Sequence, residues 1–583
     1  MRTDRSPQHR SSTLLLAVLT AFALVLGACS QSSDNSSNDE SEAVNTEEVA
    51  LESEGTPQTG GTIAMAVTAE TNGWNPALSQ WADAGNFVGS TFLEPLLVYN
   101  GDGSLVPWLA ESVTSDDPEH RSWTVKIRPG IMFHDGTELQ ANAYKRSIEL
   151  AIFEGLSSVA LGQLLDVVEV VDDYTFRVRL NVSWAHFPNV IAGQIGLAMS
   201  ESMLDSPNSG RDNPVGTGPY RFESWTPDLS VKVNRYDNYW GGPCALPEPE
   251  ESVVQLCEEA GIPLGQKNGP FLDSMEFRPI TDSLQRANAL QSGDLDLILT
   301  TRASDIAALK SSYQVVSDND SERTFVLLNT AVPPFDNIHA RKALAYGTDR
   351  QEIVDALASG EQLGLDTSPF REDSRWGGLA PNETGYPEFN LELARQEVEA
   401  YKADTGQPNL SFTFSGFPIV EDLDLQQNLL EQWREIGIEA RIDTIEQTQF
   451  ILKLTQADFQ AALFRNYGYP DPDSDYVFWS RQTAEQAIKI NFSQYWSETT
   501  EAAVSWGRTA EAFEARQPGY QELVIDRNEN AIDIWLFNTP YSLIGDNNIR
   551  GLNWFRSIGF GNFLPKPYMG SLWIDQSVES SNA

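Results

Sequence analysis

Hydrophobic and polar residues alternate in several short stretches of the first half of the chain. A period of two is typical of strands that are buried on one face only. The pattern predicts strands at 123–127 and 174–180. The short apolar run at 62–67 also resembles a strand, and the segment 218–235 resembles a pair of strands that is divided near Asp228. Turn residues such as Pro129 and Gly130 separate these stretches. We therefore expect half-buried antiparallel strands in this part of the protein.

Hydrophobic residues of the second half recur every three or four positions, which is the spacing of one helical face. One such face follows the candidate N-cap Asn390 and comprises Leu391, Ala394, Val398 and Tyr401. A second face precedes Gly437 and a strand-like stretch at 438–442, and it comprises Leu425, Leu429, Trp433 and Ile436. Helices that alternate with strands indicate an α/β domain, and these apolar faces are expected to form its core.

A further helix is expected after residue 349. Asp349 and Glu352 have the spacing of a capping box, in which each side chain caps a backbone N–H near the helix start. Gly360 follows within a few residues and can end a helix.

The N-terminus has the pattern of an export signal. Residues 1–12 contain arginines, and the apolar run 13–26 is shorter than the ~20 residues that a bilayer span requires. The segment ends in LGAC at 26–29, which resembles the lipobox of bacterial lipoproteins. This resemblance implies that residues 1–28 are removed and that Cys29 is lipidated. The alternative is an unprocessed signal with an incidental cysteine.

Charge and composition distinguish an acidic segment after the signal from the rest of the chain, which is expected to fold. Residues 29–60 are acidic and lack Lys, Arg and aromatic residues, so we expect a disordered tether there. The whole chain of 583 residues has 39 Lys and Arg against 83 Asp and Glu, a net charge of −44, which excludes a basic nucleic-acid-binding surface. A hydrophobic fraction of 41% with 15 Trp nevertheless indicates that most of the chain folds.

The two remaining cysteines are Cys244 and Cys257. An exported compartment is oxidising, so a disulfide is favoured over two free thiols. A zinc site is disfavoured because no histidine or second cysteine pair lies nearby.

The common signatures of enzymes are absent from the sequence. It contains no hydrolase elbow of the form GxSxG, no phosphate loop and no HExxH zinc motif. Asp471, Asp473 and Asp475 resemble the start of a calcium loop, but Tyr476 stands at the glycine position and Gln482 at the final carboxylate position. Many carboxylate pairs exist, yet nothing selects one for glycosidase-type chemistry. We therefore expect no catalysis, metal or cofactor.

An ordered set of sequence blocks resembles a known family. The blocks are TFLEPLLVY at 91–99, LVPWLAES at 105–112, WTVKIRPGIMFH at 123–134, NPVGTGPY at 213–220, NYWGG at 238–242, LQSGDLD at 290–296, RKALAY at 341–346 and TDR at 348–350. Together they are similar to the solute-binding proteins of peptide-type ABC importers, the family 5 or dipeptide/oligopeptide-binding group. Individually the blocks have structural roles in turns and strand ends, so they identify the scaffold rather than the ligand.

The resemblance implies an α/β fold of the periplasmic-binding-protein-like type II class, a three-domain, two-lobed clamshell. By analogy we expect a base domain in three parts, with an extra domain and an opposing lobe inserted between them. The expected limits are 61–104, 217–304 and 541–583 for the base domain, 105–216 for the extra domain and 305–540 for the opposing lobe.

The resemblance also places ligand contacts in the cleft between the lobes, with one departure from the family pattern. In peptide-binding relatives a carboxylate shortly before an acidic-Pro pair binds the α-amino group of the ligand. The matching pair here is Asp471-Pro472, and the carboxylate position falls on Gly468 or Tyr469. Arginine positions of some relatives fall on Leu454 and Leu463. The candidate ligand-binding residues are Gln80, Trp81, Thr300, Phe325, Arg465, Asn466, Tyr467 and Tyr469, although the aromatic residues could instead pack between domains.

The function that follows from the resemblance is capture of a solute outside the cytoplasm. We expect a monomeric lipoprotein, anchored to the outer face of the bacterial membrane, that delivers peptides or peptide-like solutes to an ABC permease and its ATPase subunits. An oligosaccharide or another neutral solute is the alternative ligand on the same fold. A secreted enzyme is the alternative from a different class.

Overall fold

The structure is a computed structural model of the full chain. It describes residues 54–79, 81, 83–100, 103–154, 161–247, 249, 251–318, 322–361, 363–370, 375–466, 470–481, 489–552, 558–559 and 568–581. The signal peptide, most of the tether and Cys29 lie outside the described residues, so these expectations stay predictions. Among the described residues, no helix is both long and apolar enough to cross a bilayer.

The largest sheet has seven strands in the order β12-β18-β11-β1-β10-β9-β8. β1 pairs in parallel with β10 and β11, and the other pairings are antiparallel. The sheet brings together strands from both ends of the chain, namely β1 (Thr62–Val67), β8 (Tyr220–Thr226), β9 (Ser230–Arg235), β10 (Ser274–Pro279), β11 (Leu297–Thr300), β12 (Gln314–Asp318) and β18 (Tyr541–Gly545). β1, β8 and β9 lie within the stretches predicted as strands.

Three smaller sheets accompany the seven-stranded sheet. A four-stranded sheet runs β4-β5-β7-β6, from β4 (Ala110–Ser115), β5 (Ser122–Ile127), β6 (Leu165–Asp172) and β7 (Thr175–Leu180). A three-stranded sheet joins β20 (Ile558–Gly559), β2 (Leu97–Asn100) and β3 (Leu105–Pro107), and β19 (Ile549–Arg550) pairs with β21 (Trp573–Ile574). β5 and β7 confirm two predicted strands, and their inward side chains Val125, Phe176 and Val178 are fully buried.

Helices of this part of the chain pack around these sheets. They are α1 (Asp83–Gly89), α2 (Ala141–Glu149) with a π-helical turn at Leu150–Glu154, α4 (Phe187–Ala192), α5 (Glu201–Leu204), α6 (Glu251–Glu259), α7 (Ser283–Gln291) and α8 (Ala303–Leu309). Short 3₁₀ turns lie at Gln194–Gly196, Pro243–Ala245 and Met569–Ser571. We call residues 54–318 and 541–581 the first lobe.

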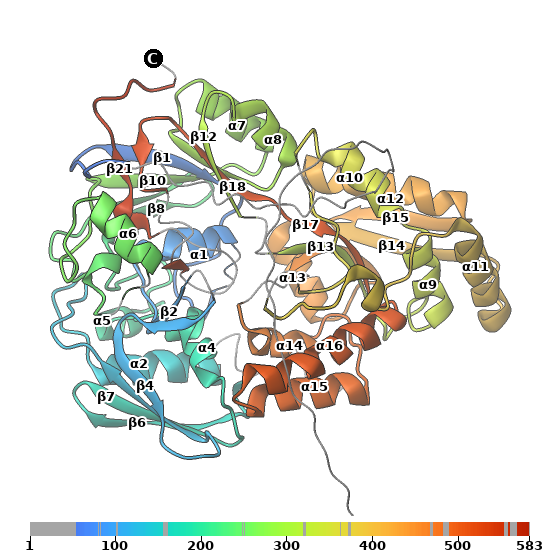
Figure 1. The fold of residues 1–583 in the computed structure, drawn as a ribbon, viewed down its shortest axis with the longest axis horizontal. Helices are drawn as coiled ribbons and strands as arrows, with labels where there is room; N and C mark the ends of the chain where they lie inside the picture. Colours follow the sequence, from blue (N-terminus) through green and yellow to red (C-terminus); the bar gives the residue numbers. More distant parts are fainter. Residues whose placement is uncertain are drawn as a thin grey trace, which may run out of the picture. The chain divides into compact units, whose positions relative to one another are not determined.

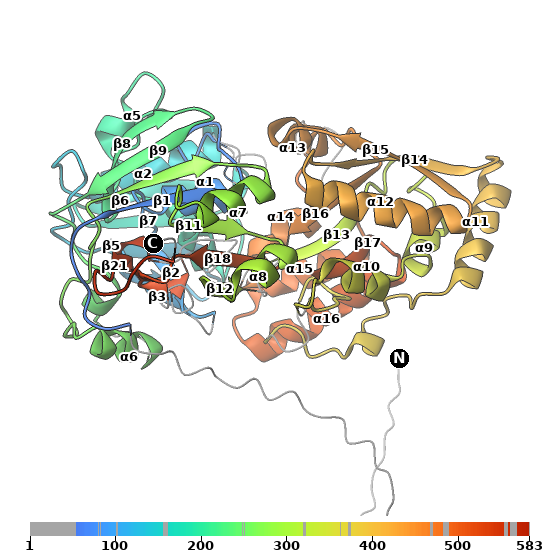
Figure 2. The same ribbon diagram turned by 90° about the horizontal axis from the view of Figure 1, so that it is seen from above.

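The second lobe, residues 322–540, is built on a five-stranded sheet of order β15-β14-β16-β13-β17. Its strands are β13 (Arg323–Leu328), β14 (Leu410–Gly416), β15 (Ile438–Thr444), β16 (Ala461–Asn466) and β17 (Asp533–Asn538). Its helices are α9 (Ile338–Tyr346), α10 (Arg350–Leu357), α11 (Leu391–Thr405), α12 (Val420–Glu435), α13 (Gln447–Thr455), α14 (Tyr476–Trp479), α15 (Glu498–Thr509) and α16 (Phe513–Glu529), with 3₁₀ turns at Pro381–Glu383 and Pro472–Asp475. Figures 1 and 2 show the elements of the two lobes as separate groups.

The predicted helical faces form the core of the second lobe. Asn390 caps α11 by accepting a hydrogen bond from the N–H of Leu393, and the α11 face packs with that of α12 in one cluster of buried side chains. Gly437, at a φ of 84°, ends α12 in the left-handed region that glycine reaches without a steric penalty. β15 then pairs in parallel with β14, as expected for the helix-then-strand pattern.

The third predicted helix, α10, begins as expected and ends earlier. Asp349 accepts the backbone N–H of Glu352 and so caps the helix. The Glu352 carboxylate accepts instead from the Gln432 amide of α12 at 3.3 Å, so only half of the predicted capping box forms. The helix ends at Leu357, before Gly360.

Each lobe has its own buried core, and the chain crosses between the lobes at two places in the sheets. One crossing leads from β12 to β13, and the other runs from β17 through Thr539 and Pro540 to β18. The domain limits expected from the sequence remain a prediction, although the pairing of β12 with β18 puts residues 314–318 in the seven-stranded sheet.

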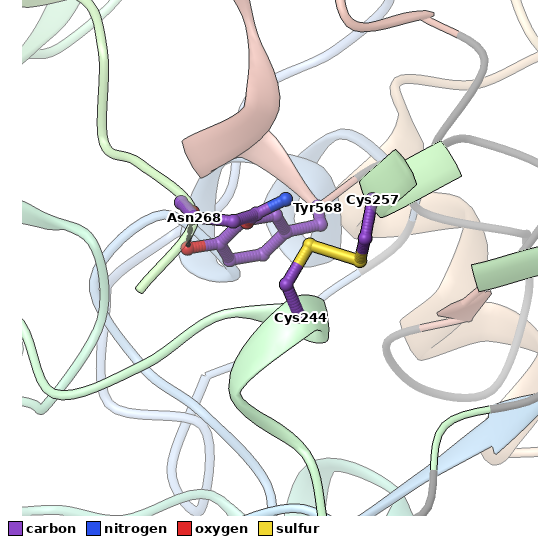
Figure 3. Close-up of a disulfide and its surroundings, with 4 residues drawn as sticks. All are labelled: Cys244, Cys257, Asn268 and Tyr568. Carbon is purple, nitrogen blue, oxygen red and sulfur yellow. Dashed lines mark hydrogen bonds between the residues drawn. A yellow bond between two sulfur atoms is a disulfide. The ribbon is translucent and has the colours of Figure 1, made fainter. Parts of the chain in front are cut away.

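A disulfide joins Cys244 and Cys257, the pairing that the sequence favours, with their Cα atoms 5.9 Å apart. It ties the turn before α6 to the end of that helix, and both cysteines are fully buried. Tyr568 lies beside the disulfide and donates a hydrogen bond to the carbonyl of Asn268 at 2.9 Å (Figure 3). The disulfide segment therefore packs against the C-terminal part of the first lobe.

Candidate functional site

Trp81, one of the candidate ligand contacts, lies inside the first lobe. Its side chain is 8% exposed, and its indole N–H donates to the carbonyl of Gly73 at 2.9 Å. The ring meets Trp74 edge-on at 6.1 Å, and a Cβ placed on Gly89 of α1 would lie 2.4 Å from it. The ring is thus held in a fixed position between α1 and the neighbouring loop. A contact with ligand stays a prediction.

Thr300 and Arg465 meet at the junction of the lobes. Thr300, at the end of β11, is fully buried and donates a hydrogen bond to Asp305 of α8 at 2.7 Å. The next residue, Thr301, accepts a hydrogen bond from Nη1 of Arg465 at 3.2 Å. Since Arg465 belongs to β16 of the second lobe, this bond connects the lobes.

Phe325 and Asn466 are buried within the second lobe. Phe325 on β13 is 1% exposed and packs against Trp535 at 5.0 Å and Phe464 at 6.0 Å between ring centres. Asn466 ends β16, opposite Arg323 of β13. The remaining candidates, Gln80, Tyr467 and Tyr469, lie outside the described residues, so the structure leaves the aromatic part of the predicted site untested.

A second set of contacts between the lobes forms a polar seam. From the first lobe it contains Trp184, Ala185 and His186, which lie just before and at the start of α4. His186 Nε2 lies 2.7 Å from the carbonyl of Ala510, and the Ala185 N–H donates to the carbonyl of Arg508 at 2.9 Å. The Trp184 indole N–H donates to the Asp473 carboxylate. We call these contacts, with that of His120 to Glu511 at 2.7 Å, the lobe seam.

Two buried ion pairs support the second-lobe side of the lobe seam. Arg516 donates two hydrogen bonds to Asp471, at 2.7 and 2.6 Å, and Arg508 donates to Asp473 at 3.3 Å. Burial would raise the pKa of Asp471, but the hydrogen bonds and charge of Arg516 outweigh it and hold that pKa below its usual range. Asp475 has no such partner among the residues that the structure describes, and burial together with the charge of Asp471 raises its pKa well above the usual range.

The partners of these aspartates could not be predicted from the sequence. The alternation of Asp471, Asp473 and Asp475 is visible in the sequence, but Arg508 and Arg516 follow only after a further helix. The side chains form ion pairs and a helix cap, because Asp471 also accepts the backbone N–H of Asp473. No local pattern predicts such pairing between distant elements.

A cavity of about 210 Å³ lies at the junction of the lobes. The first lobe contributes residues 301–304, which follow β11, and the second lobe contributes the end of α10, the start of α12, the end of β16 and residues near the β17–β18 crossing. β14 and β16 are parallel, and their carboxyl ends open on this cavity at Phe417 and Arg465. Crevices at the carboxyl ends of parallel strands are the common location of ligand sites in α/β sheets. We call it the junction cavity.

Solved structures share this arrangement of lobes. The DppA periplasmic binding protein from Helicobacter pylori, solved with the peptide STSA, superposes with a TM-score of 0.74 at 19% identity, over 89% of this chain and 99% of that one. The oligopeptide-binding protein AppA from Bacillus subtilis, solved with a nonapeptide, gives 0.72 at 20% identity over 89% and 100%. The fold is therefore that of a type II periplasmic binding protein, as the sequence predicts.

Sequence comparisons identify the family. Residues 104–487 match the model of bacterial extracellular solute-binding proteins, family 5 (Middle). The chain belongs to this family, which confirms the predicted resemblance.

Individual relatives match over part of their length. The glutathione-binding protein GsiB of Pectobacterium atrosepticum is 28% identical over 282 residues, 47% of this chain and 49% of that protein. GsiB of Salmonella typhimurium is 26% identical over 382 residues, 62% and 65% respectively. The heme-binding protein A of Haemophilus influenzae is 24% identical over 499 residues, 79% and 82%. The chain thus spans about half to two thirds of the length of the glutathione-binding relatives.

Proposed function

We propose that this protein is the extracytoplasmic substrate-binding component of an ABC importer, which captures peptides or peptide-like solutes between its lobes and presents them to a membrane permease and its ATPase. The observation that carries this proposal is the division of the chain into two lobes, each built on its own main sheet and core, that are connected at two crossings. Membership of the solute-binding family supports it.

The mechanism is a change in the population of open and closed lobes. A ligand that contacts both lobes binds the closed arrangement better than the open one, and this difference in affinity shifts the equilibrium toward the closed form. The lobe seam and the bond from Arg465 to Thr301 are contacts that such closure would make. The permease would then select the closed form. No bond is made or broken in this process.

The ligand contacts remain part of the proposal. We assign them to Gln80, Trp81, Thr300, Phe325, Arg465, Asn466, Tyr467 and Tyr469. Thr300 and Phe325 are buried, so they act by shaping the site, whereas Arg465 lines the junction cavity. Peptides are the favoured ligand because two structural neighbours were solved with peptides, and an oligosaccharide is the second candidate.

The N-terminal pattern supports a lipid anchor at Cys29 on the outer face of the membrane. Replacement of Cys29 with Ser should abolish incorporation of labelled palmitate and release the protein into the medium or periplasm. Labelling of the C29S variant equal to that of the unaltered chain would contradict the anchor.

A ligand screen tests the proposed function. The purified chain without residues 1–28 is titrated with di- to pentapeptides, glutathione and oligosaccharides while the melting temperature is followed. Saturable stabilisation by peptides, with the peptide recovered unchanged, is expected. Stabilisation by a sugar and by no peptide would replace the peptide assignment, and conversion of the added compound into a product would indicate an enzyme.

The candidate aromatic residues are tested in the same assay. Replacing both Tyr467 and Tyr469 with Ala should abolish the ligand-induced shift and leave the melting temperature of the ligand-free protein nearly unchanged. An unaltered shift would reject their place in the site.

A further inference from the structure

Three carboxylates gather at the lobe seam, on one 3₁₀ turn and the residue before it. Asp473 and Asp475 are buried, and the side chain of Asp471 is only 13% exposed. Two guanidiniums pair with them, because Arg516 binds Asp471 and Arg508 binds Asp473. Three carboxylates and two guanidiniums leave one negative charge in excess. An unpaired charge is costly to bury, so one further positive charge would stabilise the seam.

The excess charge belongs to Asp475. Among the described residues, its Oδ1 atom is buried and has no hydrogen-bond partner. Its side chain also makes no capping hydrogen bond at the start of α14, whereas Asp471 accepts the backbone N–H of Asp473. Burial and the charge of Asp471 raise the pKa of Asp475, as expected for a carboxyl group that is neutral in this arrangement of the lobes.

The first lobe covers the turn that carries these aspartates. α4 packs against the turn, and Trp184 and His186 hydrogen bond to its second-lobe surroundings. Tyr99 of β2 donates to Asn189 of α4 at 3.0 Å. Burial, together with the charges of the three aspartates, raises the pKa of Tyr99, so the carboxylates face the first lobe. When the lobes separate, this cover is removed and water reaches the turn.

The other titratable groups around the turn leave the excess charge in place. Tyr476 starts α14 directly after the turn, and Tyr520 lies on α16. Burial raises the pKa of Tyr520 and of Tyr99, so both phenols stay neutral. His186 lies with Nδ1 3.8 Å from Asp471. The excess can thus be removed by a proton on this imidazole or on the unpaired aspartate.

We propose that Asp475 takes up a proton from solvent when the lobes close and releases it when they open, so that acidic pH favours the closed form. The proposal rests on the lobe movement of the proposed function and not on the identity of the ligand. It assigns the proton to the carboxyl group, because the His186 ring already bonds to the Ala510 carbonyl through Nε2.

The direction of the pH effect follows from the raised pKa of Asp475 in the closed form. In the open form this carboxyl is hydrated and titrates near pH ~4. Its contribution to closure is therefore fully present below about pH 4 and is lost as the pH rises toward the closed-form pKa. Uptake of one proton on closing changes the ratio of closed to open lobes by up to about tenfold per pH unit.

X-ray scattering of the full chain without added solute tests the proposal. The ratio of closed to open lobes should fall about tenfold or more between pH 5 and pH 8, so the radius of gyration should increase with pH. A radius of gyration that is the same at pH 5 and pH 8 would overturn the proposal.

Replacement of Asp475 assigns the effect to this group. Asp475→Asn keeps the shape of the side chain and removes the charge, so D475N should keep the smaller radius at pH 8. Asp475→Ser, a smaller neutral side chain, should behave alike and serves if D475N does not fold. The matched control is Asp296→Asn in the first lobe, where burial also raises the pKa and the side chain accepts the Ala64 N–H at 2.7 Å. D296N should retain the full pH dependence.

His186→Gln tests the competing site for the proton. Glutamine can still donate to the Ala510 carbonyl but does not titrate, so H186Q should retain the pH dependence of the radius. Retention of that dependence in D475N and its loss in H186Q would place the proton on the imidazole and overturn the assignment.

The outcome is separable from that of the proposed function. A peptide-induced rise in melting temperature, with a radius that does not depend on pH, would leave the transport proposal intact and reject the proton uptake. A radius that depends on pH in the unaltered protein but not in D475N would support the proton uptake even if no peptide or sugar stabilised the chain.

Discussion

Glu94 shows how a single buried residue can hold several segments together. Its side chain is fully buried and accepts hydrogen bonds from the side chains of Trp108, Tyr239, Thr217 and Trp240, at 2.9, 2.7, 2.8 and 3.0 Å. Burial raises the pKa of Glu94, and the four donors oppose this effect. A carboxylate suits this position because it can accept from all four donors, and an indole N–H can only donate.

Replacing Glu94 with Gln should therefore lower the free energy of unfolding by about 1–3 kcal/mol. The glutamine amide keeps one acceptor oxygen and replaces the other with an NH₂ group. Each carboxylate oxygen of Glu94 accepts from one indole N–H and one hydroxyl, so in either orientation of the amide one indole N–H loses its acceptor. The measurement is the midpoint of urea unfolding. Glu111→Gln, which removes an exposed carboxylate paired with Lys126 at 2.9 Å, is the control and should change the midpoint little. Equal midpoints for E94Q and the unaltered protein would contradict the argument.

The raised pKa of Asp422 implies that the free energy of unfolding depends on pH. Its pKa of about 6 in the folded protein lies above the usual value of 3.8, so the folded state holds the proton more tightly than the unfolded state. The contribution of Asp422 to the free energy of unfolding is fully present below about pH 4. It is lost as the pH rises through 6, which lowers the free energy of unfolding by on the order of 3 kcal/mol. Its charged neighbours in the cavity are Glu421 and Asp424 on α12, Arg465 on β16 and Arg302 at α8.

The D422N variant lacks this component of the pH dependence. The difference in free energy of unfolding between D422N and the unaltered protein should therefore grow in favour of D422N between pH 4 and pH 8. A difference that is independent of pH would show that Asp422 keeps an ordinary pKa in the folded protein.

At the scale of elements, the disulfide stabilises α6 and the segment around it. A loop of this length, with a sequence separation of 13, is stabilised by about 3 kcal/mol through restriction of the unfolded chain. Replacing both Cys244 and Cys257 with Ser should lower the free energy of unfolding by about 2–4 kcal/mol. Calorimetry with and without a phosphine reductant checks this value: the reductant should destabilise the unaltered protein and have no effect on the double variant.

Among the helices, the sequence predicted correctly those caps that depend only on residues close together in the chain. Asn390 and Asp349 cap their helices because the side-chain acceptor and the backbone N–H lie a few residues apart. The second half of the capping box failed because Gln432, distant in sequence, packs against Glu352 and hydrogen bonds to it. Long-range packing thus altered a contact that local spacing predicts.

At the scale of the whole molecule, we expect the contacts of the lobe seam to hold the two lobes together and so to oppose their opening. His186 makes a hydrogen bond to the carbonyl of Ala510 and approaches Asp471 at 3.8 Å, across the two lobes. Replacing His186 with Ala removes these contacts. If the closed arrangement of the lobes loses about 1 kcal/mol of stabilisation, the ratio of open to closed lobes rises about fivefold. The radius of gyration in solution, measured by X-ray scattering, should increase, and ligand affinity should fall.

His339→Ala is the matched control for this change. His339 lies on α9 of the second lobe and pairs with Glu397 of α11 in the same lobe, at 2.6 Å. The H339A variant should therefore keep the radius of gyration of the unaltered protein. An equal change in H186A and H339A would mean that the lobe seam does not control opening.

The sequence by itself determined the fold class, the family, the main strands and helices and the cysteine pairing, because each is carried by local periodicity, by ordered motifs or by composition. It also named Arg465 and Thr300 as candidate ligand contacts, which stays a prediction, and the structure brings Arg465 to Thr301, next to Thr300. It did not find Asp422, because an aspartate in the first turn of a helix is indistinguishable in sequence from a solvated N-terminal charge. Only the tertiary structure decided that α12 begins at a junction of two lobes, where this buried carboxylate lines the same cavity as Arg302 and Arg465, because elements distant in sequence meet there.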